Sequence, residues 1–218
     1  MISISATFSS LGSALARGFT KAVDAIKDKF FKKAKEPMSV NVGIINNPQV
    51  AKYAAYLEYG WVQTVTGKQA KWFRAQLGND APAKGSVLVM PPRPIFGATK
   101  RACGDKWANY VKTAIETSKG KVDTEKLLAA VGTIAAGDIR NTIAHNGTAD
   151  EKFADRSPLT LALLSKQTAG HKTDGSGSLS RSQALIRSHA LINSIHYQIV
   201  KGVPEAGKQP GIINISAD

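Results

Sequence analysis

The chain has 218 residues, of which 43% are hydrophobic and 21% charged, so it is not a disordered polypeptide and is long enough for one full core. A single cysteine, Cys103, excludes an internal disulfide and a cysteine-based zinc site, and no apolar run reaches the ~20 residues of a membrane span. The formal charge of +13 favours contact with a polyanion or an acidic partner, although a basic surface also serves solubility.

Positive charge is concentrated in three regions of the chain. Net charges of +4, +6 and +4 fall in residues 1–36, 61–106 and 157–201, and the remaining residues sum to −1. We therefore weigh a basic binding surface equally with a basic surface that only keeps the protein in solution.

Residues 1–37 predict an amphipathic helix with a basic polar face, closed by Pro37. The N-terminal sequence lacks a basic region followed by a continuous apolar stretch, so we expect no signal peptide. We expect this helix to cover a sheet, with a membrane surface or a partner protein as the alternative. Its apolar stripe recurs at spacings of three and four: Leu11, Leu15, Phe19, Val23, Ile26 and Phe30.

An α+β core domain is predicted for residues 38–201. Residues 39–44 alternate between apolar and small or polar side chains, which predicts a half-buried strand. Pro48 predicts the start of a short helix over residues 48–59, and Gly60 predicts its end.

One face of this short helix is predicted to be buried. Tyr53, Tyr56 and Leu57 lie three and four residues apart, so they share a helical face. We expect that face to pack on a sheet formed by residues 40–44 and 195–199.

Residues 61–86 show no clear hydrophobic period and are predicted to form a long arm between elements. The arm holds two tryptophans, one phenylalanine and four basic residues, with Asp80 as its one acid. Aromatic and arginine side chains dominate many protein interfaces. We therefore expect another subunit or virion protein to contact Trp61, Trp72, Phe73 and Arg74, with Glu58, Tyr59 and Arg93 at the junction.

The second half of the chain predicts helices separated by short strands. A strand at residues 86–90 leads through three prolines into a helix over residues 95–118. The fold class is therefore α+β: a small mixed or antiparallel sheet packed against several helices, with a long aromatic-basic arm. The remaining predicted elements are a helix from Asp123 to Gly147, a short helix begun by Pro158, a Gly/Ser-rich mobile loop at 167–183, a strand over 195–199 and a C-terminal tail at 202–218 with a short strand in "GIINIS".

Catalytic motifs are weak in this sequence. His145 is followed by Asp150, Glu151 and Asp155, but no His pair at helical spacing frames a metal site. A solvated acidic connection between helices is the favoured interpretation. We expect no enzyme activity, no cofactor and no bound metal.

Several short motifs occur in a characteristic order between Ser39 and Lys201: "VNVGII", "YAAYLEYG", "MPPRPIF", "IRNTIAHN", "SPLTLALLSK" and "INSIHYQIV". Their order and spacing resemble tailed-bacteriophage tail-completion and head–tail joining (neck) proteins. Two departures stand out. The gap between Gly60 and Pro91 is longer than in that family, and Ser188-His189 replaces a Thr-Gly turn.

The resemblance implies a structural virion protein, made in the host cytoplasm. It implies a homo-oligomeric ring with six-fold or twelve-fold symmetry at the head–tail junction, closed by head-to-tail contacts. The implied partners are other copies of the chain, neighbouring neck, connector or tail-tube proteins, and packaged DNA in the lumen. No membrane partner is expected.

Two other function classes remain as alternatives. The first is a DNA-binding module acting directly through its basic surface, which strong salt-dependent binding to free duplex DNA would favour. The second is a metal-dependent nuclease, which loss of activity on chelation would favour. In either the ring or the DNA-binding reading, the residues expected to face DNA or an acidic partner are Lys68, Lys71, Lys84, Arg181 and Arg187.

Glu58 is expected near the rim of the helix that ends at Gly60. An acid there opposes the helix dipole, so a compensating cation is expected. Arg93, held between prolines, is the predicted partner, either within the subunit or across the ring.

Overall fold

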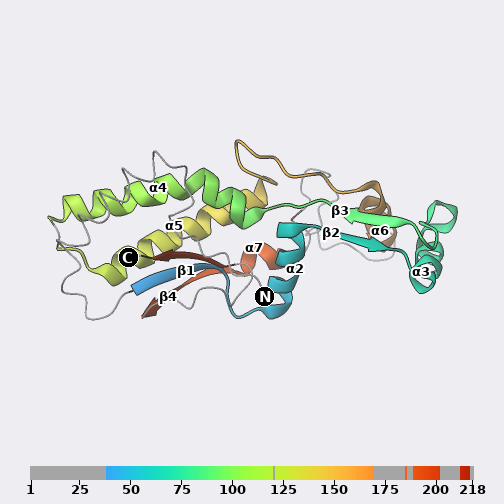
Figure 1. Cartoon of the computed structure of the whole chain (residues 1–218), viewed down its shortest axis with the longest axis horizontal. Coiled ribbons are helices and arrows are strands. Elements are labelled where there is room, and N and C mark those ends of the chain that lie inside the picture. Colours follow the sequence, from blue (N-terminus) through green and yellow to red (C-terminus); the bar gives the residue numbers. More distant parts are fainter. Residues whose placement is uncertain (1–37, 120, 169–184, 186–188, 202–211, 217–218) are drawn as a thin grey trace.

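The computed structural model describes residues 38–119, 121–168, 185, 189–201 and 212–216. The helix predicted for residues 1–37 lies outside the described residues, as do residues 169–183 of the predicted loop and most of the C-terminal tail. The described elements confirm an α+β fold, in which helices and antiparallel strands occupy separate parts of the molecule (Figure 1).

A three-stranded antiparallel sheet forms one layer of the described structure. Strand β1 (Met38–Ile44) is central, between β4 (Ile195–Lys201) and β5 (Ile212–Ser216). Val42 lies opposite Tyr197 on one side and Ile213 on the other, so the predicted pairing of the two longer strands is confirmed. Because β1 is central, it is more deeply buried than the half-buried strand expected from its alternation.

Two long helices form the layers above this sheet. Helix α5 (Thr124–Ala144) packs on β1 and β4, and helix α4 (Ile95–Thr117) packs on α5 (Figure 1). The side chain of Asp123 accepts a hydrogen bond from the Lys126 backbone nitrogen, as its predicted N-cap role requires. The core lies between these layers and includes Val40, Val42, Phe96, Val131, Ala135, Ile139 and Ile195.

Helix α2 (Pro48–Tyr59) begins and ends as predicted, but the expected buried face is wrong. Ala54 and Leu57 are buried, whereas Tyr53 and Tyr56 are about half exposed. The reason is that α5 already covers the sheet, so α2 packs on α4 and on the short helix α7 (Ala190–Asn193).

The predicted arm has regular secondary structure, contrary to expectation. Strand β2 (Trp61–Thr64) pairs antiparallel with β3 (Val87–Met90), and helix α3 (Gly67–Leu77) with a 3-10 turn over Gly78–Asp80 closes the far end. Helix α6 (Pro158–Thr168) packs beside α3. Figure 1 shows this extension projecting away from the three-stranded sheet and its helices.

None of the helices in the described ranges combines the length and apolar character that a membrane crossing requires.

Candidate interaction surface

The base of the extension joins the end of α2 to the proline-rich start of α4. Gly60 has a positive φ of 69°, and a Cβ added there would lie 2.6 Å from the Met90 carbonyl oxygen and 2.9 Å from the Pro92 nitrogen. The backbone N–H of Arg93 donates to the Leu57 carbonyl oxygen at 2.6 Å. The two proline-flanked and glycine-ended sequences are therefore one junction, which fixes the direction in which the extension leaves the core.

Glu58 supplies the N-terminal cap of helix α4. Its carboxylate accepts hydrogen bonds from the backbone nitrogens of Phe96 at 3.0 Å and Gly97 at 2.9 Å. Pro94 at the N-cap position provides no side-chain cap of its own. The carboxylate satisfies two otherwise unpaired N–H groups and faces the positive end of the α4 dipole, so it is stabilised there.

Arg93 points elsewhere in the same junction. Its guanidinium donates to the carbonyl oxygens of Ala154 at 2.8 Å and Asp155 at 2.9 Å, and only 6% of the residue is exposed. The predicted pair with Glu58 is therefore wrong within the chain. Each of the two buried groups finds backbone partners, and Glu58 lies in the interior rather than at the rim.

Burial changes the proton affinity of Glu58. Desolvation raises the pKa of the carboxyl above its usual value of 4.5, and the hydrogen bonds from Gly97 and Phe96 oppose this only in part. The folded protein therefore binds a proton at Glu58 more readily than the unfolded chain does. Its contribution to stability is greatest below about pH 4.5 and declines as the pH rises through the raised pKa.

A Glu58→Gln variant is expected to lose this pH dependence. We expect the free energy of unfolding of the parent protein to fall, relative to the variant, as the pH is raised from about 4.5 through the folded pKa of Glu58. Urea denaturation of both proteins at a series of pH values measures the difference. A Glu125→Gln variant on the exposed first turn of α5 is the control, and an identical pH profile for all three proteins would contradict the assignment.

The ribbon face is the solvent-facing side of the β2–β3 ribbon, formed by Val62, Thr64, Val87 and Val89. The register places Val62 opposite Val89 and Thr64 opposite Val87. The three valines are 60–69% exposed, whereas residues on the opposite side of the ribbon are partly buried. An isolated two-stranded ribbon is only marginally stable in water, and grouped exposed apolar side chains mark a contact surface.

The basic tip is the far end of the extension, residues 66–85. Thr66 and Gln69 form a reciprocal capping box that starts α3. Phe73 is buried, with the Trp72 ring edge-on to it at 5.1 Å between centroids. Phe73 therefore supports the tip from inside, and Trp72 is the aromatic side chain left exposed for a partner.

The surface of the basic tip is strongly positive. Within residues 61–90 there are four basic residues and one acid, giving a net charge of +3. The basic side chains are all exposed: Lys68, Lys71, Arg74 and Lys84. Arg181 and Arg187, the other two basic residues predicted to face DNA or an acidic partner, lie outside the described residues.

A second exposed apolar surface lies on helix α2. Tyr53, Tyr56 and Tyr59 follow one another at intervals of three residues and are 46–50% exposed. Residues at this spacing occupy one side of a helix. We refer to these three residues as the tyrosine face. Of the junction residues predicted to contact a partner, Tyr59 lies in this surface and Trp61 is half-buried at the start of the ribbon.

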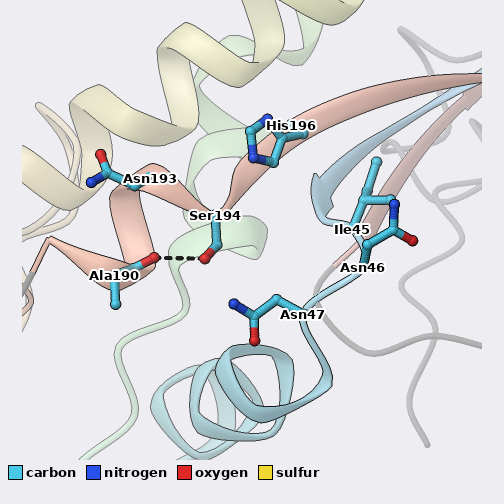
Figure 2. Close-up of a pocket in the computed structure, with 7 residues that line it drawn as sticks. All are labelled: Ile45, Asn46, Asn47, Ala190, Asn193, Ser194 and His196. Carbon is cyan, nitrogen blue, oxygen red and sulfur yellow. Dashed lines mark hydrogen bonds between the residues drawn. The ribbon is translucent and has the colours of Figure 1, made fainter.

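A shallow open depression lies where β1, α2, α7 and β4 meet (Figure 2). Its volume is about 380 Å³, and its lining includes Asn46, Asn47, Asn193 and His196. The Ser194 hydroxyl points to the Ala190 carbonyl oxygen and donates to it at 2.6 Å. The lining side chains carry no carboxylate or ammonium group, and the serine proton is already bonded, so the depression shows no nucleophile–base pair.

The acidic segment after α5 is not a metal site in the described structure. His145 Nδ1 lies 2.8 Å from the Asn141 carbonyl oxygen, and Glu151 pairs with Arg101 at 2.5 Å. Within the described ranges, no group of three or more His, Cys, Asp or Glu residues is arranged to hold a metal ion.

Sequence reasoning missed the ribbon face and the tyrosine face. The pairing of "WVQT" with "VLVM" was available as two short alternating segments, and the Thr66-x-x-Gln69 motif signals a helix start. Comparisons with protein-family models, with curated proteins and with solved structures gave no match to this chain.

Proposed function

We propose that the protein is a structural virion subunit that forms a homo-oligomeric ring at the head–tail junction of a tailed bacteriophage. In this role the ring joins the tail to the head around the DNA path. The observation that carries the proposal is the projecting extension, which displays three exposed valines on a ribbon that no described element covers. A free-standing ribbon of this kind is suited to assembly between subunits.

The junction at the base of the extension supports the proposal. The motifs by which the sequence resembles tail-completion and neck proteins include Glu58-Tyr59-Gly60 and Pro91-Pro92-Arg93-Pro94. These two motifs lie together, with Gly60 against Pro92 and the Leu57 carbonyl bonded to Arg93. They hold an extension at a fixed angle, which a subunit that reaches a neighbour requires.

A DNA-binding module is the second candidate, favoured by the basic tip. Four exposed cations near one exposed tryptophan suit a phosphate backbone, and such binding weakens steeply with salt. Tight, salt-sensitive binding of the isolated protein to duplex DNA, with no role in particle assembly, would favour this candidate over the first.

Removal of the extension from the subunit tests the proposed function. We expect a variant lacking residues 63–84, with the flanking strands joined by a short Gly-Ser turn, to keep its circular dichroism spectrum and fail to support particle joining. In a phage that depends on this chain, DNA-filled heads and free tails would accumulate, as electron microscopy of lysates would show. The control carries a Gly-Ser insertion after Ser118, at the exposed end of α4. Normal yields of joined, infectious particles from the shortened chain would contradict the proposal.

A further inference from the structure

The ribbon face and the tyrosine face are two different apolar surfaces of one chain. Both remain exposed in the folded subunit, so neither covers the other. The ribbon face offers a flat aliphatic strip, and the tyrosine face offers aromatic rings with hydroxyl groups. Tyrosine is enriched at the centre of protein interfaces because its ring buries a large area while its hydroxyl keeps a hydrogen-bond partner.

An acidic loop adjoins the tyrosine face. Residues 148–155 carry three acids and one lysine, a net charge of −2, and Asp150 and Asp155 are exposed. Arg93 ties this loop to the end of α2, because it bonds the carbonyl oxygens of Ala154 and Asp155 and also lies within electrostatic range of Tyr53. The tyrosine face and the acidic loop thus form one continuous surface of mixed aromatic and acidic character.

The extension carries the complementary features in the same combination. Its ribbon face is apolar, and the basic tip at its end has three positive charges in excess. Charge complementarity of this kind steers association and fixes the direction of docking. Contact between two unlike surfaces of the same chain is heterologous, so each copy both offers an extension and receives one.

We propose that the ribbon face of one copy docks on the tyrosine face of a second copy, with the basic tip against the acidic loop of that copy. The proposal rests on the proposed function in that it names the contact by which the ring closes. It assigns the basic tip to a protein surface rather than to DNA.

Two variants of the full chain separate the two halves of the contact. Val62→Lys with Val89→Lys alters the ribbon face, and Tyr53→Lys with Tyr56→Lys alters the tyrosine face. All four positions are exposed, so the fold should tolerate the changes. Each variant alone is expected to raise the self-association dissociation constant by about tenfold or more in sedimentation velocity.

Mixing the two variants gives the decisive result. A head-to-tail contact leaves one intact pair of surfaces in the mixture, so a one-to-one heterodimer is expected that grows no further. A mixture that stays monomeric overturns the proposal, as does a parent protein that is monomeric at all concentrations. Parent protein that assembles while both variants assemble equally well also overturns it, although the location of the subunit in the virion would still stand.

Charge reversal tests the basic tip independently. Lys68→Glu with Lys71→Glu is expected to weaken self-association, and a second copy carrying Asp150→Lys with Asp155→Lys is expected to restore it. Lys112→Glu with Lys119→Glu, at exposed positions on the far side of the core, makes the same change in charge as a control and should have little effect. If reversal at the tip leaves assembly intact and instead abolishes binding to a duplex DNA fragment, the assignment of the tip to a protein surface is wrong.

Discussion

Gly60→Ala is expected to lower the free energy of unfolding by more than about 3 kcal/mol, since left-handed strain of ~1–2 kcal/mol adds to an overpacking cost of similar size. The added methyl group would meet the Met90 carbonyl oxygen at 2.6 Å and the Pro92 nitrogen at 2.9 Å. Both contacts are with backbone atoms, and the prolines cannot rotate away. Urea denaturation followed by circular dichroism measures the loss.

Gly78→Ala is the matched control for this prediction. Gly78 has nearly the same positive φ, 67° against 69°, but a Cβ added there meets no atom within 4 Å. It should therefore show the conformational strain alone, about 1–2 kcal/mol. Equal losses in the two variants would mean that Gly60 only terminates α2 and that no close approach to the proline segment exists.

Arg93→Ala is expected to cost about 2–4 kcal/mol, because it removes two hydrogen bonds from a buried charged donor and leaves two carbonyl oxygens without that partner. Burial already lowers the pKa of Arg93, so this cation is held in place by its geometry at some electrostatic cost. Chemical denaturation measures the stability. Limited proteolysis should show faster cleavage in residues 148–157, which Arg93 ties to the extension.

Arg101→Ala provides the comparison on the same loop. Arg101 pairs with Glu151, but the two side chains are 61% and 39% exposed, and such pairs contribute about 0–1 kcal/mol. If removal of Arg93 were no more harmful than removal of Arg101, the link between the extension and the acidic loop would have no energetic role.

Much of the core was predictable because its signals are local. Pro48, Gly60 and Asp123 fix the helix boundaries by their own backbone and side-chain chemistry, and the structure places those boundaries where they were expected. The pairing of β1 with β4 also followed from sequence, since each strand carries a run of β-branched residues.

The extension was not predictable by the same reasoning. Helix α3 buries only Phe73, so it shows no apolar stripe, and β2 is four residues long with its partner far along the chain. Hydrophobic periodicity needs a buried face to report, and this segment is exposed on most sides. The capping box at Thr66 was its one strong local signal.

The role of Glu58 was hidden for a different reason. At the end of α2 an acid opposes the dipole of its own helix, which led to the expectation of a cationic partner. In the folded chain the carboxylate meets the N-terminus of α4, whose dipole favours it, and backbone N–H groups take the place of Arg93. Sequence spacing alone does not show where a second helix begins in space.

Electron cryomicroscopy of purified virions that carry a compact label on this subunit tests the proposed function most directly. The account predicts label density arranged as a closed ring at the head–tail junction, around the axis along which DNA passes. Label at another position on the particle, or intact virions that contain no copy of the subunit, would contradict it.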